Sequence, residues 1–206
     1  MQANQPFKLA VLVSGNGSNL QAIIDYVEAG EIHASIACVI SNIPDAYALT
    51  RAAKHGIPAI IHEGCRFTNR REYDRSLVEI LKSHEVELVV LAGFMRILTE
   101  VMIDAFQQRI INIHPALLPA FPGLNAQQQA LDYGVRFSGC TVHFVDHGTD
   151  TGPIILQAVV PVMQDDTVDQ LSQRILKEEH KLFPQAIKLL VDHKISLHGR
   201  RVLLEH

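Results

Sequence analysis

The chain has 206 residues, 48% of them hydrophobic and 19% charged, with a formal net charge of −4 at pH 7. This is the composition of an ordinary globular protein, and a chain of this length buries roughly 70% of its extended surface without needing disulfides. Nucleic-acid-binding proteins normally carry a basic surface, so the acidic balance leads us to expect small-molecule partners and no nucleic acid.

The cysteines and the start of the chain indicate a cellular location. Cys38, Cys65 and Cys140 are far apart and form no Cys-x-x-Cys pair, which favours free thiols in a reducing cytoplasm. The first residues lack the charged leader and cleavage site of a signal peptide. No run approaches the roughly 18 apolar residues of a membrane helix. We therefore expect a cytoplasmic protein with no membrane partner.

The first half of the chain alternates short apolar runs with stretches of helical spacing. We expect strands at 7–13, 34–40, 57–61 and 87–93, and helices at 19–30, 45–56 and 70–84. This alternation predicts an α/β fold with a doubly wound, mostly parallel sheet and helices on both faces.

The second half continues this pattern. We expect strands at 109–114, 139–145 and 153–162, helices at about 125–133 and 167–192, and a closing C-terminal hairpin at 195–204 that turns at His198–Gly199. The long helix starts at a Thr-x-x-Gln capping box. No linker or repeat interrupts the chain, so we expect a single domain over 1–206.

The first expected strand leads into a glycine-rich turn, SGNGSN at 14–19. Glycines allow backbone N–H groups to face an anion where the next helix starts. Leu20 replaces the third glycine of the dinucleotide fingerprint, and no Lys-Ser/Thr follows as in a P-loop. The turn therefore suits a single phosphate group held with Ser18 and Asn19, although a tight turn without a ligand would need the same glycines.

Two further segments follow strands at the expected carboxyl edge of the sheet. GFMRIL at 93–98 sets apolar residues beside Arg96, which suits a flat aromatic ligand with an acidic tail, or a buried connection with a solvated Arg. Asn112 and His114 share one face of their strand, and Pro115 ends it. A flavodoxin-like order, with the first and fourth strands adjacent and the fifth following, brings the glycine turn, this loop and the Asn112–His114 pair to one edge.

Two other positions are ambiguous. His143 and His147 are four residues apart, but four strand residues span about 13 Å, too far for the ligands of one ion. We expect no metal there. Glu179 lies on the apolar stripe of the long helix. A carboxylate pointing inward needs partners, which favours a functional role, unless it sits at the edge of the stripe and reaches solvent.

With these residues together, the chain resembles the phosphoribosylglycinamide (glycinamide ribonucleotide) formyltransferases, which are folate-dependent. The matching segments are SGNGSNLQAII, VVLAGFMRIL, NIHPALLPAFPG, TVHFVD with DTGPIILQ, and EEHKLFP. They follow one another over essentially the whole chain. The resemblance implies a Rossmann-like formyltransferase fold, with a phosphate-binding half at 1–108 and a catalytic and folate-binding half at 109–206.

The resemblance also implies an activity and its site. The chain is expected to transfer a formyl group from 10-formyltetrahydrofolate to glycinamide ribonucleotide in purine (IMP) biosynthesis, without a metal. The residues implied are Asn112, His114 and Asp150 for catalysis; Gly17, Ser18, Asn19 and Glu179 for the ribonucleotide; and Arg70, Met95, Arg96, Ile97, Leu98, Asn112, His147 and Asp150 for the folate. The chain departs from several relatives at Asn125, where they carry His, and from some at Leu176, where they carry Lys.

The same residues leave three alternative activities to consider. Formyltetrahydrofolate deformylases share the Asn-His-Asp set but add a regulatory domain, which we do not expect because the first strand begins about seven residues in. Methionyl-tRNA formyltransferases are longer and bind tRNA through a further domain. A phosphate-binding sensor without catalysis would not need His114 or Asp150. The sequence leaves the choice between monomer and homodimer open.

Overall fold

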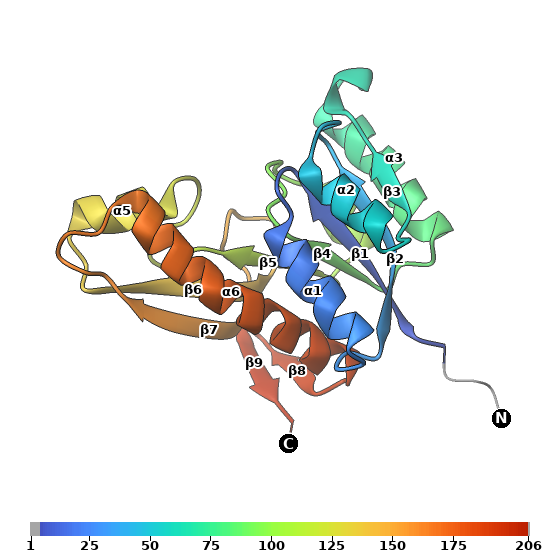
Figure 1. Ribbon diagram of the computed structural model, residues 1–206. Coiled ribbons are helices and arrows are strands. Elements are labelled where there is room, and N and C mark those ends of the chain that lie inside the picture. The colour runs from blue at the N-terminus through green and yellow to red at the C-terminus, as the bar shows by residue number, and fades with distance from the viewer. Residues whose placement is uncertain (1–4, 206) are drawn as a thin grey trace. The chain divides into compact units, whose positions relative to one another are not determined.

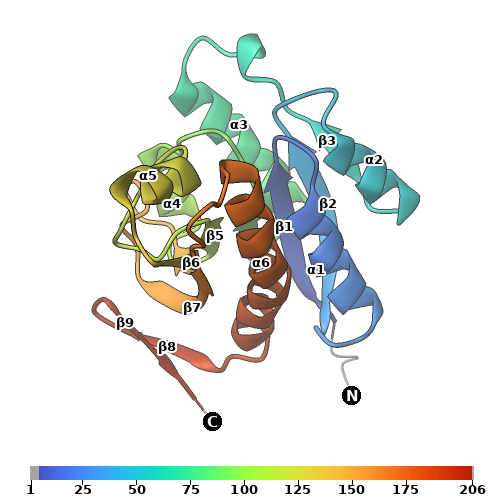
Figure 2. The ribbon, with the colours of Figure 1, turned by 60° about the vertical axis from the view of Figure 1, so that its left-hand side comes forward.

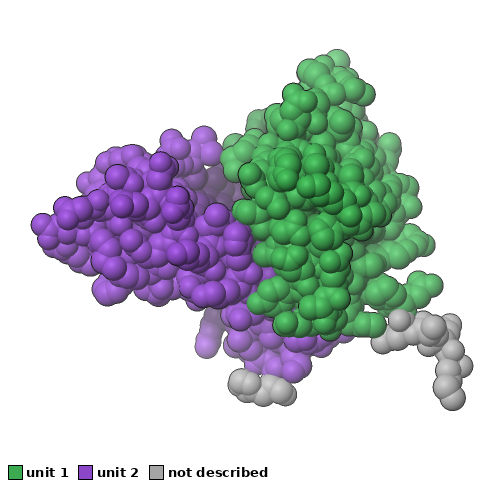
Figure 3. All heavy atoms as spheres, viewed as in Figure 1, with its two compact units in different colours: residues 1–111 green, residues 112–206 purple. Residues whose placement is uncertain are grey.

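The computed structural model describes residues 5–205. The chain forms two compact units, Met1–Ile111 and Asn112–His206, which Figure 3 distinguishes by colour. Among the described residues, no helix has both the length and the apolar character needed to cross a membrane.

In the first unit, strands and helices alternate along the chain (Figure 1). Its elements are β1 (Phe7–Val13), α1 (Ser18–Glu28), β2 (Ala34–Ser41), α2 (Tyr47–Lys54), β3 (Ala59–Ile61), the 3-10 turn η1 (Gly64–Arg66), α3 (Arg70–Ser83), β4 (Leu88–Leu91) and α4 (Glu100–Ala105). Strand β5 (Ile110–His114) starts in this unit and ends in the second.

Strand β1 is the centre of the first unit. It pairs in parallel with β2 on one side and β4 on the other, so that Val11 lies opposite both Val39 and Val90. Its residues Leu9 to Val13 are fully buried, as expected of a parallel strand covered on both faces. Right-handed crossovers place α1 and α2 on one face of these strands and α3 on the other, which can be followed in Figure 1.

The second unit is built on an antiparallel pair. Its elements after β5 are α5 (Ala126–Tyr133), β6 (Phe137–Phe144), β7 (Ile154–Pro161), α6 (Val168–Val191), β8 (Ile195–His198) and β9 (Arg201–Leu204). Strands β6 and β7 pair antiparallel, with Thr141 opposite Gln157. Helix α6 packs along both of them, as Figures 1 and 2 show. The predicted capping box is present, because the Thr167 and Gln170 side chains each bond the other residue's backbone N–H.

The strand order is β3-β2-β1-β4-β5-β6-β7, with β8 and β9 as a separate hairpin. The mostly parallel sheet with a closing hairpin confirms the predicted fold class. The adjacency of β1 and β4 is also confirmed, but the flavodoxin-like label is wrong. The order 3-2-1-4-5 is that of the classic dinucleotide-binding sheet, whereas a flavodoxin-like sheet places its third strand beside its first.

Two local predictions need correction. Helix α4 is not predicted, because its six residues are too few to display helical periodicity. The hairpin turns at Gly199 and Arg200 rather than at His198–Gly199, since His198 still pairs with Arg201. Gly199 has φ +62, which a residue without a side chain adopts without strain.

Candidate functional site

The glycine turn between β1 and α1 presents a helix start without a side-chain cap. Gly17 takes the N-cap position with φ 75 and ψ 32, and as a glycine it makes no side-chain cap hydrogen bond to α1. A Cβ on Gly17 would lie 2.6 Å from the Cβ of Ala48, so α2 packs directly against the turn. The first-turn N–H groups of a helix have no intrahelical acceptors. The turn that carries Ser18 and Asn19 therefore has the geometry of an anion site.

Arg51 of α2 holds this turn in place through hydrogen bonds. The sequence alone does not predict this role. The Arg51 Nε donates to the backbone oxygen of Asn16 at 2.9 Å, and its Nη2 donates to Asn16 Oδ1 at 2.9 Å. Its third nitrogen donates to Gln21 Oε1 at 3.2 Å. The contact joins two consecutive helices, so it depends on tertiary structure and leaves no local signal in the sequence.

The loop after β4 lies against the same turn, as predicted for this part of the sheet edge. Ser14 donates its backbone N–H to Gly93 O at 3.0 Å, and Met95 donates its backbone N–H to Ser14 Oγ at 2.8 Å. The side chains of Met95 and Ile97 are 67% and 66% exposed, whereas Leu98 is buried. The loop thus offers two large apolar side chains to a ligand. That Asn112 and His114 join this edge stays a prediction.

The other end of this loop is held by a buried carboxylate. Thr99 donates both its backbone N–H and its hydroxyl to Asp74 Oδ2, at 2.5 and 2.7 Å. Within the loop, the Arg96 guanidinium lies 4.1 Å from the centre of the Tyr73 ring and close against Gly64. The Arg96 side chain therefore packs on the protein itself, and its contact with an acidic ligand tail stays a prediction. Arg70 is the exposed first residue of α3.

In the second unit, His114 at the end of β5 is buried and contacts oxygen atoms on both sides of its ring. Nε2 donates to the backbone oxygen of Phe121 at 2.8 Å, which places a proton on this nitrogen. Nδ1 lies 3.3 Å from Asp150 Oδ2. Two residues for which the resemblance implies a catalytic role are thus in direct contact.

Asp150 is held in a strained loop, with a non-glycine φ of 54. Such residues cluster at functional sites. The carboxylate accepts the Gly123 backbone N–H at 2.8 Å. Burial raises the pKa of Asp150, but the contact with His143, the Gly123 N–H and the nearby imidazole charges outweigh it, so the pKa lies below its ordinary value. Asp150 is therefore a carboxylate at neutral pH.

Asn112 is oriented by His143, a residue for which the sequence alone indicates no role. Its Nδ2 donates to His143 Nε2 at 3.2 Å, while His143 Nδ1 donates to Phe144 O at 2.8 Å. An amide nitrogen carries two hydrogens, so Asn112 keeps one for another acceptor. His143 Nε2 also lies 3.6 Å from Asp150 Oδ1. His143 thus links Asn112 to Asp150, a role that depends on β5 and β6 being neighbours.

The remaining predicted residues lie on α6 and on the loop after β6. Glu179 is 7% exposed and lies on the buried face of α6, as its stripe position indicated. Burial raises the pKa of the Cys140 thiol to about 12, and the negative charge of Glu179 adds to this shift. The Glu179 carboxylate therefore lies near Cys140 of β6. His147 is exposed. At the position where several relatives carry His, Asn125 is the left-handed N-cap of α5.

Comparisons with known proteins show the family to which the chain belongs. The family model described as formyl transferase matches residues 7–187. The phosphoribosylglycinamide formyltransferase of Haemophilus influenzae is 42% identical over 198 residues, which are 96% of this chain and 93% of that protein.

The chain is also similar to one part of a larger protein. The trifunctional purine biosynthetic protein adenosine-3 of Drosophila melanogaster is 50% identical over 187 residues, or 90% of this chain, but these are only 14% of that protein. A crystal structure of glycinamide ribonucleotide transformylase 1 from Symbiobacterium toebii superposes with a TM-score of 0.97 at 48% identity, over 99% of this chain and 96% of that one. The chain belongs to the formyl transferase family, with the phosphoribosylglycinamide formyltransferases.

Proposed function

We propose that the chain transfers the formyl group of 10-formyltetrahydrofolate to the amine of glycinamide ribonucleotide. The products are formylglycinamide ribonucleotide and tetrahydrofolate, in de novo purine (IMP) biosynthesis. The observation that carries the proposal is a chain of contacts within one unit: Asn112 contacts His143, and Asp150 lies 3.6 Å from His143 and 3.3 Å from His114. The similar transformylases support the choice of substrates.

The chemistry requires a donor and a proton carrier. The amine nitrogen attacks the formyl carbon and forms a C–N bond, giving a tetrahedral intermediate with an oxyanion. Asn112 donates its second amide hydrogen to this oxyanion, a contribution worth about 3 kcal/mol in comparable sites. The bond from the carbon to N10 of the folate then breaks, and the carbonyl re-forms.

His114 and Asp150 manage the proton that must leave the amine and reach N10 of the folate. The imidazole is the side chain best suited to both steps near neutral pH. Asp150, whose pKa is lowered, stays negative beside it and stabilises the imidazolium. No covalent enzyme intermediate and no metal is part of this mechanism.

The two substrates are assigned to separate sets of residues. Gly17, Ser18 and Asn19 bind the phosphate of the ribonucleotide at the uncapped start of α1, and buried Glu179 accepts hydrogen bonds from its ribose hydroxyls. The folate contacts Arg70, the segment Met95–Leu98, Asn112, His147 and Asp150. Within that segment the apolar Met95 and Ile97 side chains are exposed and suit a flat ring system, whereas Arg96 contributes its backbone.

The proposal extends to the partners and location of the chain. The chain acts on small molecules, as a monomer or a homodimer, in the cytoplasm. The three cysteines support a reducing compartment, since Cys38, Cys65 and Cys140 are all free thiols.

The test follows folate deformylation with and without the ribonucleotide. The expected result is turnover only when the amine is present, with formylglycinamide ribonucleotide formed in equal amount to tetrahydrofolate. Turnover that continues without the amine, with release of formate, would replace the transferase by a deformylase. Binding of the ribonucleotide without turnover would indicate a sensor.

A further inference from the structure

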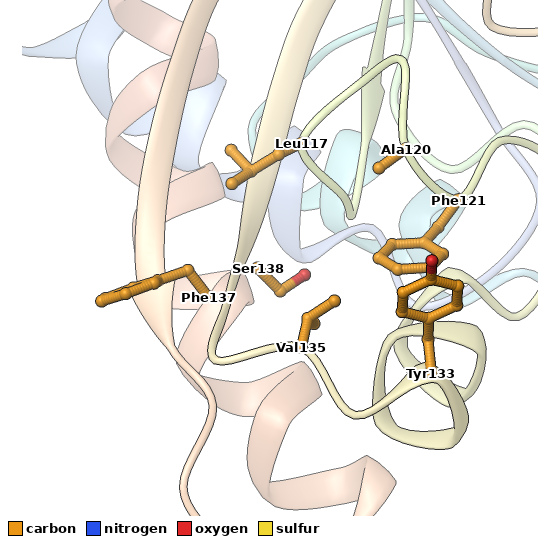
Figure 4. Close-up of a pocket in the computed structure, with 7 residues that line it drawn as sticks. All are labelled: Leu117, Ala120, Phe121, Tyr133, Val135, Phe137 and Ser138. Carbon is orange, nitrogen blue, oxygen red and sulfur yellow. The ribbon is translucent and has the colours of Figure 1, made fainter.

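A pocket outside the residues assigned to the substrates opens in the second unit, with a volume of about 430 Å³. Its walls come from the loop after β5, the end of α5 and the start of β6, and include Leu117, Phe121, Tyr133, Val135 and Phe137 (Figure 4). The Phe121 and Tyr133 rings meet edge to face with centroids 5.8 Å apart. Pockets of this size with aromatic walls are typical of small-molecule sites.

Two hydroxyl groups line this pocket, those of Tyr133 and Ser138, and the Ser138 hydroxyl is buried without a partner among the described residues. Ser138 is 1% exposed, and its hydroxyl has no hydrogen-bond partner among the residues that the structure describes. Figure 4 shows the hydroxyl oxygen pointing into the space toward Phe121 and Tyr133. A buried hydroxyl left unpaired is unfavourable. A ligand with one hydrogen-bonding group would satisfy it.

One residue of the pocket wall, Phe121, also forms a hydrogen bond with His114. The side chain of Phe121 lines the pocket, while its backbone oxygen accepts the hydrogen bond from His114 Nε2 at 2.8 Å. Phe121 has a left-handed φ of 54, which a bulky residue adopts only when its surroundings impose it. The base of the loop is fixed separately, since Thr141 Oγ1 bonds both Leu118 N and Ala116 O, at 3.0 and 2.7 Å. Phe121 therefore joins the pocket to His114 within a single residue.

We propose that this pocket binds a small, flat, uncharged aromatic molecule with one hydrogen-bonding group on Ser138, and that its occupancy shifts the His114 imidazole through Phe121. The binding is independent of the proposed formyl transfer, whereas its effect on turnover rests on that function. Such a ligand is an effector, because it occupies none of the residues assigned to either substrate.

Binding is tested with 2-naphthol, and naphthalene is the matched probe that lacks the hydroxyl. In NMR titrations of the full chain, 2-naphthol should shift the resonances of Leu117 and Val135 and bind about three- to tenfold more tightly than naphthalene. Ser138→Ala should abolish this preference, whereas the control Ser196→Ala on β8 should keep it. Ala120→Phe fills the pocket from its exposed rim and should remove binding of both probes. Equal affinities in the unmodified chain, or binding that survives Ala120→Phe, would overturn the site.

The coupling between the pocket and the His114 ring can be measured by NMR without measuring formyl transfer. The His114 ring resonances should move on addition of 2-naphthol to the unmodified chain and stay fixed in Ala120→Phe. With both substrates saturating, kcat should change by at least twofold in the unmodified chain only. Binding with no change at the His114 ring would overturn the coupling. If the chain shows the NMR shifts with 2-naphthol but no formyl transfer, the proposed function is wrong while the binding site is confirmed.

Discussion

At the scale of single residues, the hydrogen bond from Asn112 to His143 has a mechanistic consequence. The amide of Asn112 is held by one of its two hydrogens, so the other has a fixed direction. A donor fixed before the reaction stabilises a developing charge without reorganising. His143 is therefore a positioning residue, and Asn112 is the group that we expect to contact the oxyanion.

Asn112→Ala should lower kcat on the order of 10²-fold or more, because the oxyanion loses a positioned donor. The KM values of both substrates should stay within a few-fold. Steady-state kinetics with each substrate varied in turn checks this. His143→Ala serves as the comparison, with a smaller loss of kcat, since the amide remains but is less constrained. If Asn112→Ala raises only the KM for the folate, Asn112 is a binding residue and its assigned role is wrong.

The sequence predicted Asn112, His114 and Asp150 but missed the roles of His143 and Arg51. Strand alternation points to Asn112 and His114, and the resemblance adds Asp150; the catalytic roles of all three stay predictions. The contact between Asn112 and His143 joins residues that are 31 positions apart in sequence and lie on different strands. Because pairing between distant strands is set by the whole sheet, no local pattern encodes it.

At the scale of elements, the start of α1 depends on the helix that packs beside it. Ala48 of α2 donates its backbone N–H to Gly15 O at 3.1 Å, and its side chain leaves no space for a Cβ on Gly17. The element pattern of this region was predictable because the periodicity changes at glycines. The close approach of α2 was not, since it follows from packing in three dimensions.

Gly17→Ala should raise the KM for the ribonucleotide at least tenfold and lower the melting temperature. A Cβ there meets Ala48 at 2.6 Å, and a left-handed conformation costs a non-glycine residue about 1–2 kcal/mol. Gly15→Ala is the matched control, because nothing lies within 4 Å of its added Cβ. Kinetics and thermal unfolding of the two variants are compared. Equal effects in both variants would show that the turn tolerates side chains and does not hold the phosphate closely.

Glu179→Ala on α6 should weaken the ribonucleotide by about 1.5–3 kcal/mol, through hydrogen bonds lost from a charged acceptor. The folate should be affected much less. Glu178→Ala is the control, because this neighbouring carboxylate pairs with Lys181 at 2.8 Å on the helix surface. Calorimetric titration of each substrate into the two variants separates the effects. A loss in folate affinity alone, or equal losses in the two variants, would contradict the assignment of Glu179 to the ribose.

At the scale of the whole molecule, stability in acid depends on carboxylates whose pKa values are lowered by folding. In the second unit these include Asp150 and Asp166. Asp166 accepts two hydrogen bonds from the Arg174 guanidinium, at 2.6 and 2.8 Å, and one from Met163 N at 2.8 Å. These contacts tie the start of α6 to the segment that follows β7, so protonating Asp166 loosens the helix that covers the antiparallel pair.

Asp166→Asn should lower the melting temperature by a few degrees at pH 7 and by progressively less toward pH 3. The sign follows from linkage: the Asp166 pKa is lowered in the folded state, chiefly by the Arg174 hydrogen bonds. The unfolded chain therefore binds more protons, and the stabilisation present above the ordinary carboxyl pKa of about 3.9 is lost as the pH falls through the folded value.

Asp165→Asn is the control for this measurement, because it removes the same charge at an exposed neighbouring position. Its melting temperature should follow that of the unmodified chain at every pH, while the curve of Asp166→Asn converges with it in acid. High salt should reduce the difference at pH 7, because the Arg174 side chain is 27% exposed and ion pairs that reach solvent are screened by salt. Parallel curves for Asp166→Asn and the unmodified chain would show that this pair does not contribute to acid unfolding.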